Sequence, residues 1–268
     1  TCPGFGSVAK YIAVATREAG LDVASMAETS TRVFILETMG RHAGWIAASS
    51  ALAREQDGDP PHVILLPEVP LDEQRFLDRV RQSVEDFGYC VVVVSEGVKT
   101  ADGRFLSDQG TRDAFGHVQL GGVAPVVAAM IKNHLGYKYH YAIADYLQRA
   151  ARHIASATDV EQAHALGRAA VELALSGRNA VMPTIVRESD SPYRWHIGDV
   201  ALEAVANREA KMPDEYIDDS GFFVTEAALR YLRPLIAGED YPPYRDGLPD
   251  YARLRGERVA RRLPPFGN

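Results

Sequence analysis

The sequence of 268 residues has few cysteines, no long apolar run and no excess of basic residues. Its two cysteines are too few for a disulfide framework or a cysteine-based metal site, which indicates a reducing, cytoplasmic environment. No apolar run approaches the roughly 18 residues of a membrane-spanning helix, so no membrane association is predicted. With 29 basic and 36 acidic residues the net charge is −7, which argues against a nucleic-acid partner because phosphate contacts need a basic face.

Two kinds of catalytic motif are also missing. The eight histidines form no His-Glu-x-x-His motif and no cluster with cysteine, so no zinc site is predicted. No Gly-x-Ser-x-Gly motif is present, so hydrolysis by a serine triad is unsupported. What remains is an ordinary globular composition, 46% hydrophobic and 24% charged, with a length that fits one or two domains.

The amino-terminal segment resembles a loop that leads into a helix beginning near Ser7. Because the sequence starts inside this loop at Thr1, we expect the gene product to carry residues before it. Gly4 and Gly6 also fit the start of a dinucleotide-binding fingerprint. No strand precedes them, which disfavours that interpretation.

Apolar strands alternate with helices in the first half of the chain. The pattern predicts helices over residues 7–19, 45–54 and 71–87 and buried strands over residues 32–37, 63–66 and 90–94. Strands separated by helices in this way form parallel βαβ units. The predicted fold class is therefore α/β, with a mostly parallel sheet and helices on both faces.

The second half reads as more helical. Its apolar spacing predicts helices over residues 121–134, 141–155, 160–176 and 225–235 and a proline-interrupted edge strand over residues 180–186. The second half therefore differs in character from the first. The remainder is predicted to be a mainly helical carboxyl-terminal extension.

Two of the predicted strands end in polar, glycine-containing turns. Ligands of open parallel sheets bind at the carboxyl ends of strands, so Arg41 and Glu96 are candidate ligand-binding residues. The glycines at positions 40 and 44 allow close approach of the backbone, and a guanidinium there suits a phosphate. The alternatives are a surface arginine in a tight turn, and a carboxylate that caps the next segment.

A third set of polar residues lies near position 145. On a helix, Asp145, Arg149 and Arg152 would share one face, and Tyr146 would lie beside Arg149. A phosphate site is one interpretation. The other is an ion pair between Asp145 and Arg149 on a solvated helix.

Taken together, the three motifs resemble the 6-phosphofructokinases. The motifs are Met39-Gly40-Arg41, Ser95-Glu96-Gly97 and Tyr146-Leu147-Gln148-Arg149, in that order. The segment Pro3-Gly4-Phe5-Gly6-Ser7, the pair Lys138-Tyr139 and the long extension are most similar to the pyrophosphate-dependent branch. The resemblance runs from residue 1 to about residue 185. It implies a fructose 6-phosphate-binding α/β domain over residues 1–155. Residues 156–268 are then a helix and strand that return to the phosphoryl-donor domain, followed by the extension.

The resemblance also assigns roles to the residues of the first two motifs. Met39, Gly40 and Arg41 would line the fructose 6-phosphate site, and Arg41 would also face the transferred phosphoryl group as a catalytic residue. Glu96 would bind hydroxyl groups of the sugar.

Further residues are implied to bind the 6-phosphate. Tyr146 and Arg149 would hold it within one subunit, and Lys138 or His140 would be an additional ligand. Arg32 matches an arginine that reaches the 6-phosphate of a neighbouring subunit, which implies a homo-oligomer.

A second segment, residues 116–122, also looks like the phosphate-binding motif of the ATP-dependent enzymes. It contains His117, but leucine stands at position 120 where that motif has an arginine, and leucine cannot bind phosphate. We therefore assign the phosphate site to Tyr146 and Arg149, and interpret His117 as loop structure.

The activity implied by the resemblance is phosphoryl transfer from pyrophosphate to the 1-hydroxyl of fructose 6-phosphate, giving fructose 1,6-bisphosphate in glycolysis. The donor loop, the catalytic aspartate and the Mg²⁺ ligands are expected before residue 1, so residues 1–268 alone are expected to be inactive. An ATP-dependent 6-phosphofructokinase and a non-catalytic regulatory subunit of the same family are the alternatives. A general α/β domain with coincidental motifs is a third.

Overall fold

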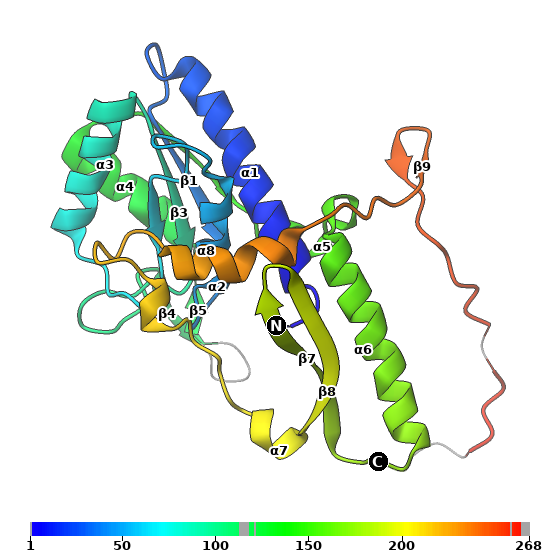
Figure 1. Ribbon diagram of the computed structural model, residues 1–268. Coiled ribbons are helices and arrows are strands. Elements are labelled where there is room, and N and C mark those ends of the chain that lie inside the picture. Colours follow the sequence, from blue (N-terminus) through cyan, green and yellow to red (C-terminus); the bar gives the residue numbers. More distant parts are fainter. Residues whose placement is uncertain (1, 113–117, 121, 258, 264–268) are drawn as a thin grey trace.

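The computed structural model describes residues 2–112, 118–120, 122–257 and 259–263, with the backbone alone at 109–112 and 118–120. Its centre is a parallel sheet in the order β2-β3-β1-β6 (Figure 1). The strands are β1 (Val33–Thr38), β2 (Val63–Leu65), β3 (Cys90–Ser95) and β6 (Tyr139–Ile143). Because all four are parallel, their carboxyl ends lie along one edge of the sheet.

Helices cover both faces of this sheet. One face packs against α3 (Glu73–Phe87) and α4 (Val123–Leu135), and the other against α1 (Phe5–Met26), α2 (Trp45–Ser49) and α8 (Glu226–Leu232) (Figure 1). Alternate residues of a strand point to opposite faces, so Ile35 and Val92 enter the first core while Leu36 and Val93 enter the second. The predicted α/β class, with helices on both faces of a parallel sheet, is confirmed.

The predicted helix over residues 141–155 is wrong. Residues 139–143 form β6, which pairs in parallel with β1. The chain then turns through Asp145, whose φ is 39°, into the short helix α5 (Leu147–Ala150) and a 3-10 turn (Arg152–Ile154). The aromatic and apolar residues that open this segment suit a strand, and pairing with β1 prevails over the helical spacing of the charged residues after it.

The second half also contains a long hairpin beside a helix. β7 (Val181–Asp190) pairs antiparallel with β8 (Tyr193–Ala201), and both run alongside α6 (Ala157–Leu175) (Figure 1). The strand predicted over residues 180–186 is present and extends further than predicted. Its partner was not predicted, because β8 alternates half-buried apolar positions with exposed charged ones and resembles a loop in composition.

The carboxyl-terminal extension is less helical than predicted. After β8 the described residues form short elements joined by loops, and residues 251–263 contain no helix or strand in the part that is described. These elements are α7 (Leu202–Val205), α8, the 3-10 turns Asp214–Tyr216 and Arg233–Ile236, β9 (Tyr244–Arg245) and β10 (Leu248–Pro249). Elsewhere, β4 (Asp108–Arg112) pairs with β5 (Val118–Leu120), and a 3-10 turn (Ser50–Ala53) follows α2.

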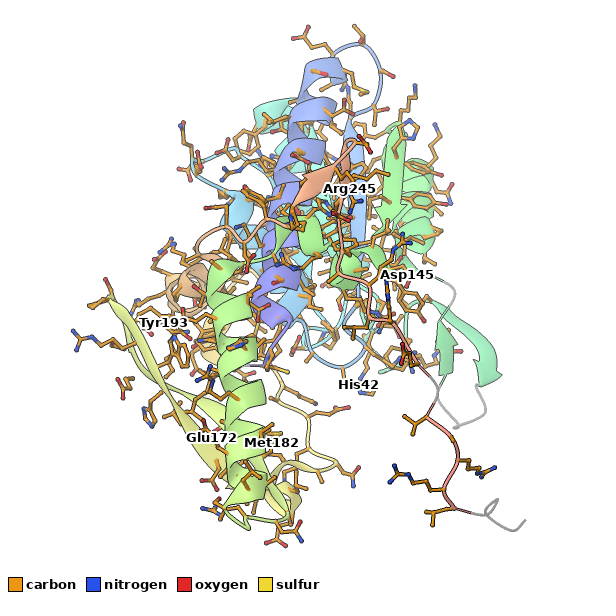
Figure 2. The ribbon with its side chains drawn as sticks, turned by 90° about the vertical axis from the view of Figure 1, so that its right-hand side faces the viewer. His42, Asp145, Glu172, Met182, Tyr193 and Arg245 are labelled. Carbon is orange, nitrogen blue, oxygen red and sulfur yellow. The ribbon has the colours of Figure 1, made fainter. Side chains whose placement is uncertain are left out.

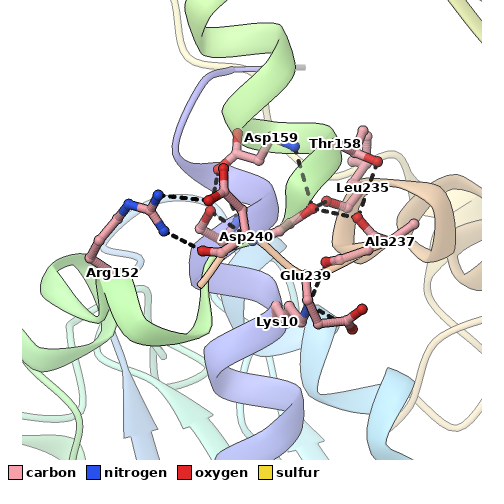
Figure 3. Close-up of polar contacts among 11 residues, drawn as sticks. Lys10, Arg152, Thr158, Asp159, Leu235, Ala237, Glu239 and Asp240 are labelled. Atoms are coloured by element: carbon pink, nitrogen blue, oxygen red, sulfur yellow. Dashed lines mark hydrogen bonds and ion pairs between the residues drawn. The ribbon is translucent and has the colours of Figure 1, made fainter. Parts of the chain in front are cut away.

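A buried carboxylate joins α6 to the start of α1. Asp159 is 5% exposed and accepts hydrogen bonds from the backbone N–H of Gly4 and Ser7 over 2.9 and 3.0 Å, and from the Ser7 hydroxyl over 2.6 Å. Nearby, Arg152 forms an ion pair with Asp240 at 2.9 Å (Figure 3). A carboxylate near a helix amino terminus satisfies free N–H groups and complements the helix dipole, so Asp159 fixes the position of α6 against the sheet domain.

Across the described residues, none of the helices combines the length and the apolar character needed to cross a bilayer.

Candidate functional site

Three of the predicted motifs lie at the same edge of the sheet. Residues 39–44 follow β1, Glu96 follows β3, and residues 145–149 follow β6. β1 is the immediate neighbour of both other strands, and adjacent strands are only about 4.8 Å apart. The turns that leave these strands therefore begin on neighbouring strands. Figure 2 labels one residue of the turn after β1, His42, and one of the turn after β6, Asp145.

Hydrogen bonds join the three turns directly. The backbone N–H of Met39 donates to Oε1 of Gln148 over 3.3 Å, and the N–H of Gly40 donates to Oε1 of Glu96 over 3.2 Å. The Ser95 hydroxyl donates to the Gly40 carbonyl. Gln148 is 2% exposed, and its amide group also donates to the Asp145 carbonyl over 2.8 Å. The motifs that follow β3 and β6 thus support the backbone of the turn that follows β1.

Arg41 lies at the centre of this arrangement. Its backbone crosses Gly97 so closely that a Cβ atom at residue 97 would come 1.9 Å from the Arg41 carbonyl oxygen. Its side chain is half-buried, and within the described residues its guanidinium forms no hydrogen bond or ion pair. A guanidinium on a fixed backbone, without a protein partner, is able to bind an anionic group in bidentate fashion.

A second guanidinium without an ionic partner comes from the turn after β6. The Arg149 guanidinium carbon lies 4.1 Å from the centroid of the Tyr146 ring, a cation–π contact, and both residues are exposed. No ion pair between Asp145 and Arg149 is present in this described segment, and Arg152 pairs with Asp240 instead. The interpretation of these charges as a helical ion pair is therefore wrong.

A buried carboxyl group lies beneath the three turns. Glu37 is 5% exposed, and its Oε2 accepts a hydrogen bond from the N–H of Ala124, at the start of α4, over 2.7 Å. Burial raises the pKa of Glu37, against the opposing effect of the α4 backbone N–H groups. Repulsion from Glu96 and Asp145 raises this pKa further. The carboxyl groups that follow β3 and β6 are thus close enough to act on the end of β1.

The remaining candidates lie elsewhere within one chain. Arg32 precedes β1, and its N–H donates to the Lys138 carbonyl over 3.0 Å. The length of β1, about 20 Å, therefore separates both residues from the turn at Arg41. Lys138 extends its amine to the Ser30 hydroxyl, 2.7 Å away. His140 lies on the edge strand β6, where it pairs with Phe34 of β1, and it is exposed. None of the three joins the cluster around Arg41 within one subunit. His117 lies outside the described residues.

Three residues of this edge escaped the sequence analysis. Glu37 ends an otherwise apolar strand, and that isolated charge is a signal that was available. Glu68 follows Pro67 after β2, and it was not predicted because this strand end has no glycine-containing motif. Gln148 was seen within its motif, but its buried supporting role was not.

Replacing Gly97 with alanine is expected to destabilise the fold by about 1–3 kcal/mol, because the new Cβ would overlap backbone atoms of Gly40 and Arg41 rather than a flexible side chain. Urea unfolding measures the effect. Gly167→Ala is the matched control: no atom lies within 4 Å of the added carbon on α6, so it should stabilise by about 0.5–1 kcal/mol. Equal responses of the two variants would contradict the close approach at Gly97.

Arg41, Arg149 and the half-buried Glu96 thus follow neighbouring strands at one edge of the sheet, and neither guanidinium has an ion pair among the described residues. This combination suits a phosphorylated polyol. The comparison with known families agrees. Residues 1–174 match the phosphofructokinase family, and the chain belongs to it.

Several similar proteins are named for the pyrophosphate-dependent reaction. The chain is 61% identical to a protein of Halomonas elongata and 63% identical to one of Methylococcus capsulatus, both named pyrophosphate–fructose 6-phosphate 1-phosphotransferase. Each match includes 98% of this chain. The matched parts are 63% of the Halomonas protein and 62% of the Methylococcus protein. Among solved structures, the chain resembles the crystal structure of a pyrophosphate-dependent phosphofructokinase from Nitrosospira multiformis, with a TM-score of 0.90 and 58% sequence identity. This match includes 99% of this chain and 63% of that protein. The chain therefore spans less than two thirds of the length of these relatives.

Proposed function

We propose that this chain supplies the acceptor site of an enzyme that transfers a phosphoryl group from pyrophosphate to the 1-hydroxyl of fructose 6-phosphate. The product is fructose 1,6-bisphosphate, and the reaction is a step of glycolysis in the cytoplasm. The observation that carries the proposal is the pair of hydrogen bonds from Met39 to Gln148 and from Gly40 to Glu96, which tie together the turns that hold Arg41 and Arg149. The names of the similar proteins support the same reaction.

Arg149 is proposed to bind the 6-phosphate of the sugar. Its guanidinium has no ionic partner in the described part of the chain, and Tyr146 restricts its orientation by stacking. A restricted planar guanidinium loses less conformational entropy when it binds a phosphate than a free one does. The phenol of Tyr146 is exposed and adds a hydrogen-bond donor beside it.

Glu96 and Arg41 are proposed to act at the other end of the sugar. One oxygen of Glu96 accepts the Gly40 N–H, which leaves lone pairs for hydroxyl groups of the substrate. Arg41 faces the phosphoryl group in transit, where its positive charge offsets the negative charge that spreads over the phosphoryl oxygens. Transfer takes the proton of the 1-hydroxyl to a base, forms the bond from that oxygen to phosphorus, and releases phosphate from pyrophosphate.

Neither the base nor a Mg²⁺ site is assigned to the described residues. Among them, no group of three or more histidine, cysteine, aspartate or glutamate side chains is arranged to hold a metal ion. We propose that residues outside the described part of the chain supply the base and the metal ligands. In the same scheme residues 1–155 form the acceptor domain, and residues 156–268 return to the donor domain and add the extension.

Arg32 is proposed to complete the acceptor site of a neighbouring subunit. It is exposed at the end of β1 opposite to the Arg41 turn, so it cannot serve its own subunit. This placement supports a homo-oligomer in which Arg32 of one copy meets the 6-phosphate bound by another, with Lys138 beside it.

The proposal is tested by assaying the full-length gene product with fructose 6-phosphate and either pyrophosphate or ATP. We expect turnover with pyrophosphate. Turnover with ATP alone would identify the ATP-dependent enzyme. Binding of fructose 6-phosphate without turnover would indicate a regulatory subunit, and absence of binding would overturn the acceptor site. Residues 1–268 alone are expected to show no turnover with either donor.

A further inference from the structure

A second acidic residue supports the Arg41 turn from outside the three motifs. Glu68 follows β2, and its carboxylate accepts the backbone N–H of Gly44 through both oxygens, at 2.9 and 3.1 Å. Its Oε1 also accepts the N–H of Met212 over 3.1 Å. One carboxylate therefore binds two segments that are 168 residues apart, the turn after β1 and the carboxyl-terminal extension.

The location of Glu68 follows from the strand order β2-β3-β1-β6. The turn leaves β1 and runs across the end of β3 toward β2. Gln148 supports its first residue from the β6 side, Gly97 lies under its middle, and Glu68 holds its last residue, Gly44. The approach is close: a Cβ at residue 44 would lie 2.8 Å from Oε2 of Glu68. Arg41 is thus in a segment that is fixed at both ends.

The segment bound on the other side of Glu68 covers the same turn. Glu209 contacts His42, and the carbonyl of Ala210 accepts the Trp45 indole N–H over 2.8 Å. Met212 is 3% exposed and packs into the core that contains α1 and α2. We call residues 209–212 the strap. The strap touches the residues immediately after Arg41, and Glu68 joins the strap to the turn.

We propose that Glu68 is a positioning residue that holds the Arg41 guanidinium in its binding geometry by fixing Gly44 and the strap. This role rests on the proposed function, because the proposed function assigns Arg41 a ligand. Glu68 does not contact the ligand itself. Removal of its carboxylate frees the Gly44 and Met212 N–H groups together, so the end of the turn and the strap both lose their common acceptor. A displacement of about 1 Å at a positioned group is enough to lower binding or turnover substantially.

The test is a double-mutant cycle in the full-length gene product, read by calorimetric titration with fructose 6-phosphate. Glu68→Gln is expected to raise Kd about tenfold in the wild-type background. Gln keeps the size of the side chain but replaces one acceptor oxygen by an amide group that faces the Gly44 N–H. In the Arg41→Ala background the same change should raise Kd less than twofold, because a positioning residue has no effect once the group that it positions is gone.

Two controls separate this role from a general loss of stability. Glu85→Gln changes an exposed carboxylate on α3 in the same way and should leave Kd unchanged. Hydrogen exchange of the peptide that spans residues 39–45 should become faster in Glu68→Gln, while exchange within β1 stays the same. Glu68→Ala, which removes both oxygens, should have the larger effect in both measurements.

Each remaining outcome has a distinct meaning. An equal increase of Kd in both backgrounds would show that Glu68 acts independently of Arg41 and would overturn the proposal, as would an unchanged Kd in Glu68→Gln. If Arg41→Ala binds fructose 6-phosphate as tightly as the wild type, Arg41 is not part of the acceptor site, and this role of Glu68 is wrong as well. If the Kd rises in Arg41→Ala but not in Glu68→Gln, the positioning role of Glu68 is wrong while the proposed acceptor site stands.

Discussion

Replacing Arg149 with alanine is expected to weaken fructose 6-phosphate binding about 10- to 100-fold. A hydrogen bond to a charged group contributes about 1.5–3 kcal/mol, and each 1.4 kcal/mol is a factor of ten in Kd. The wild-type residue has no competing ion pair in the described chain, so little of its interaction with a phosphate is offset by a lost protein contact. Calorimetric titration of the full-length protein measures the change.

Two variants make this result specific. Arg194→Ala removes an exposed arginine on β8 and should leave the affinity unchanged. Tyr146→Phe keeps the stacked ring but removes the hydroxyl, so it should cost less than the loss of Arg149. An Arg149→Ala protein with wild-type affinity would exclude this residue from the site.

Acidification from pH 7 to pH 4 is expected to destabilise the fold by about 3 kcal/mol through His62 alone, because its pKa falls from 6.5 to about 4 on folding. The cause is burial first and the positive charge of Arg54 second; the side chain is 1% exposed. Its Nδ1 accepts the Val91 N–H over 3.0 Å and its Nε2 lies 3.1 Å from the Gly58 carbonyl. These partners require the neutral ring with the proton on Nε2.

The sign of the effect follows from proton binding. Above pH 6.5 the ring is neutral in both states and the full stability is present. As the pH falls from 6.5 toward 4, the unfolded chain binds a proton that the folded chain excludes, and the free energy of unfolding decreases.

Other groups titrate in the same range, so the measurement is a comparison of variants. Urea unfolding at pH 7, 5.5 and 4 should show that His62→Asn, whose amide oxygen can accept the Val91 N–H, is less stable than the wild type at pH 7. The difference should shrink as the pH falls. His153→Asn, at an exposed position, should follow the wild type throughout. A difference between wild type and His62→Asn that stays constant with pH would contradict the buried neutral ring.

The first half of the fold was predictable from the sequence because its signals are local. β1, β2 and β3 are continuous apolar runs, and each of the helices between them has an apolar stripe of its own. The turn at Arg41 and the position of Glu96 follow directly from the ends of those runs. These local signals therefore predict the first two motifs at one edge of the sheet, but they do not predict the third motif there.

Errors arose where tertiary pairing decides the structure. The residues of β6 suit a strand, but they form no continuous apolar run like those of β1 and β3. The partner strand, β1, is also more than 100 residues away in sequence. The hairpin partner β8 has the same difficulty. The supporting residues Gln148 and Glu68 bind backbone N–H groups of a turn that is distant in sequence. Because almost every residue has a backbone N–H group, the sequence does not indicate which of these groups a distant side chain will bind.

The strand order has a consequence for synthesis of the protein. β6 is the last of the four strands to leave the ribosome, yet it lies beside β1, the first, and its turn carries Gln148 and Arg149. A nascent chain that ends before residue 139 therefore lacks both the edge strand of the sheet and the turn that carries Gln148 and Arg149. In the proposed acceptor site, a sugar phosphate therefore becomes a stabilising ligand only after these residues have emerged and docked.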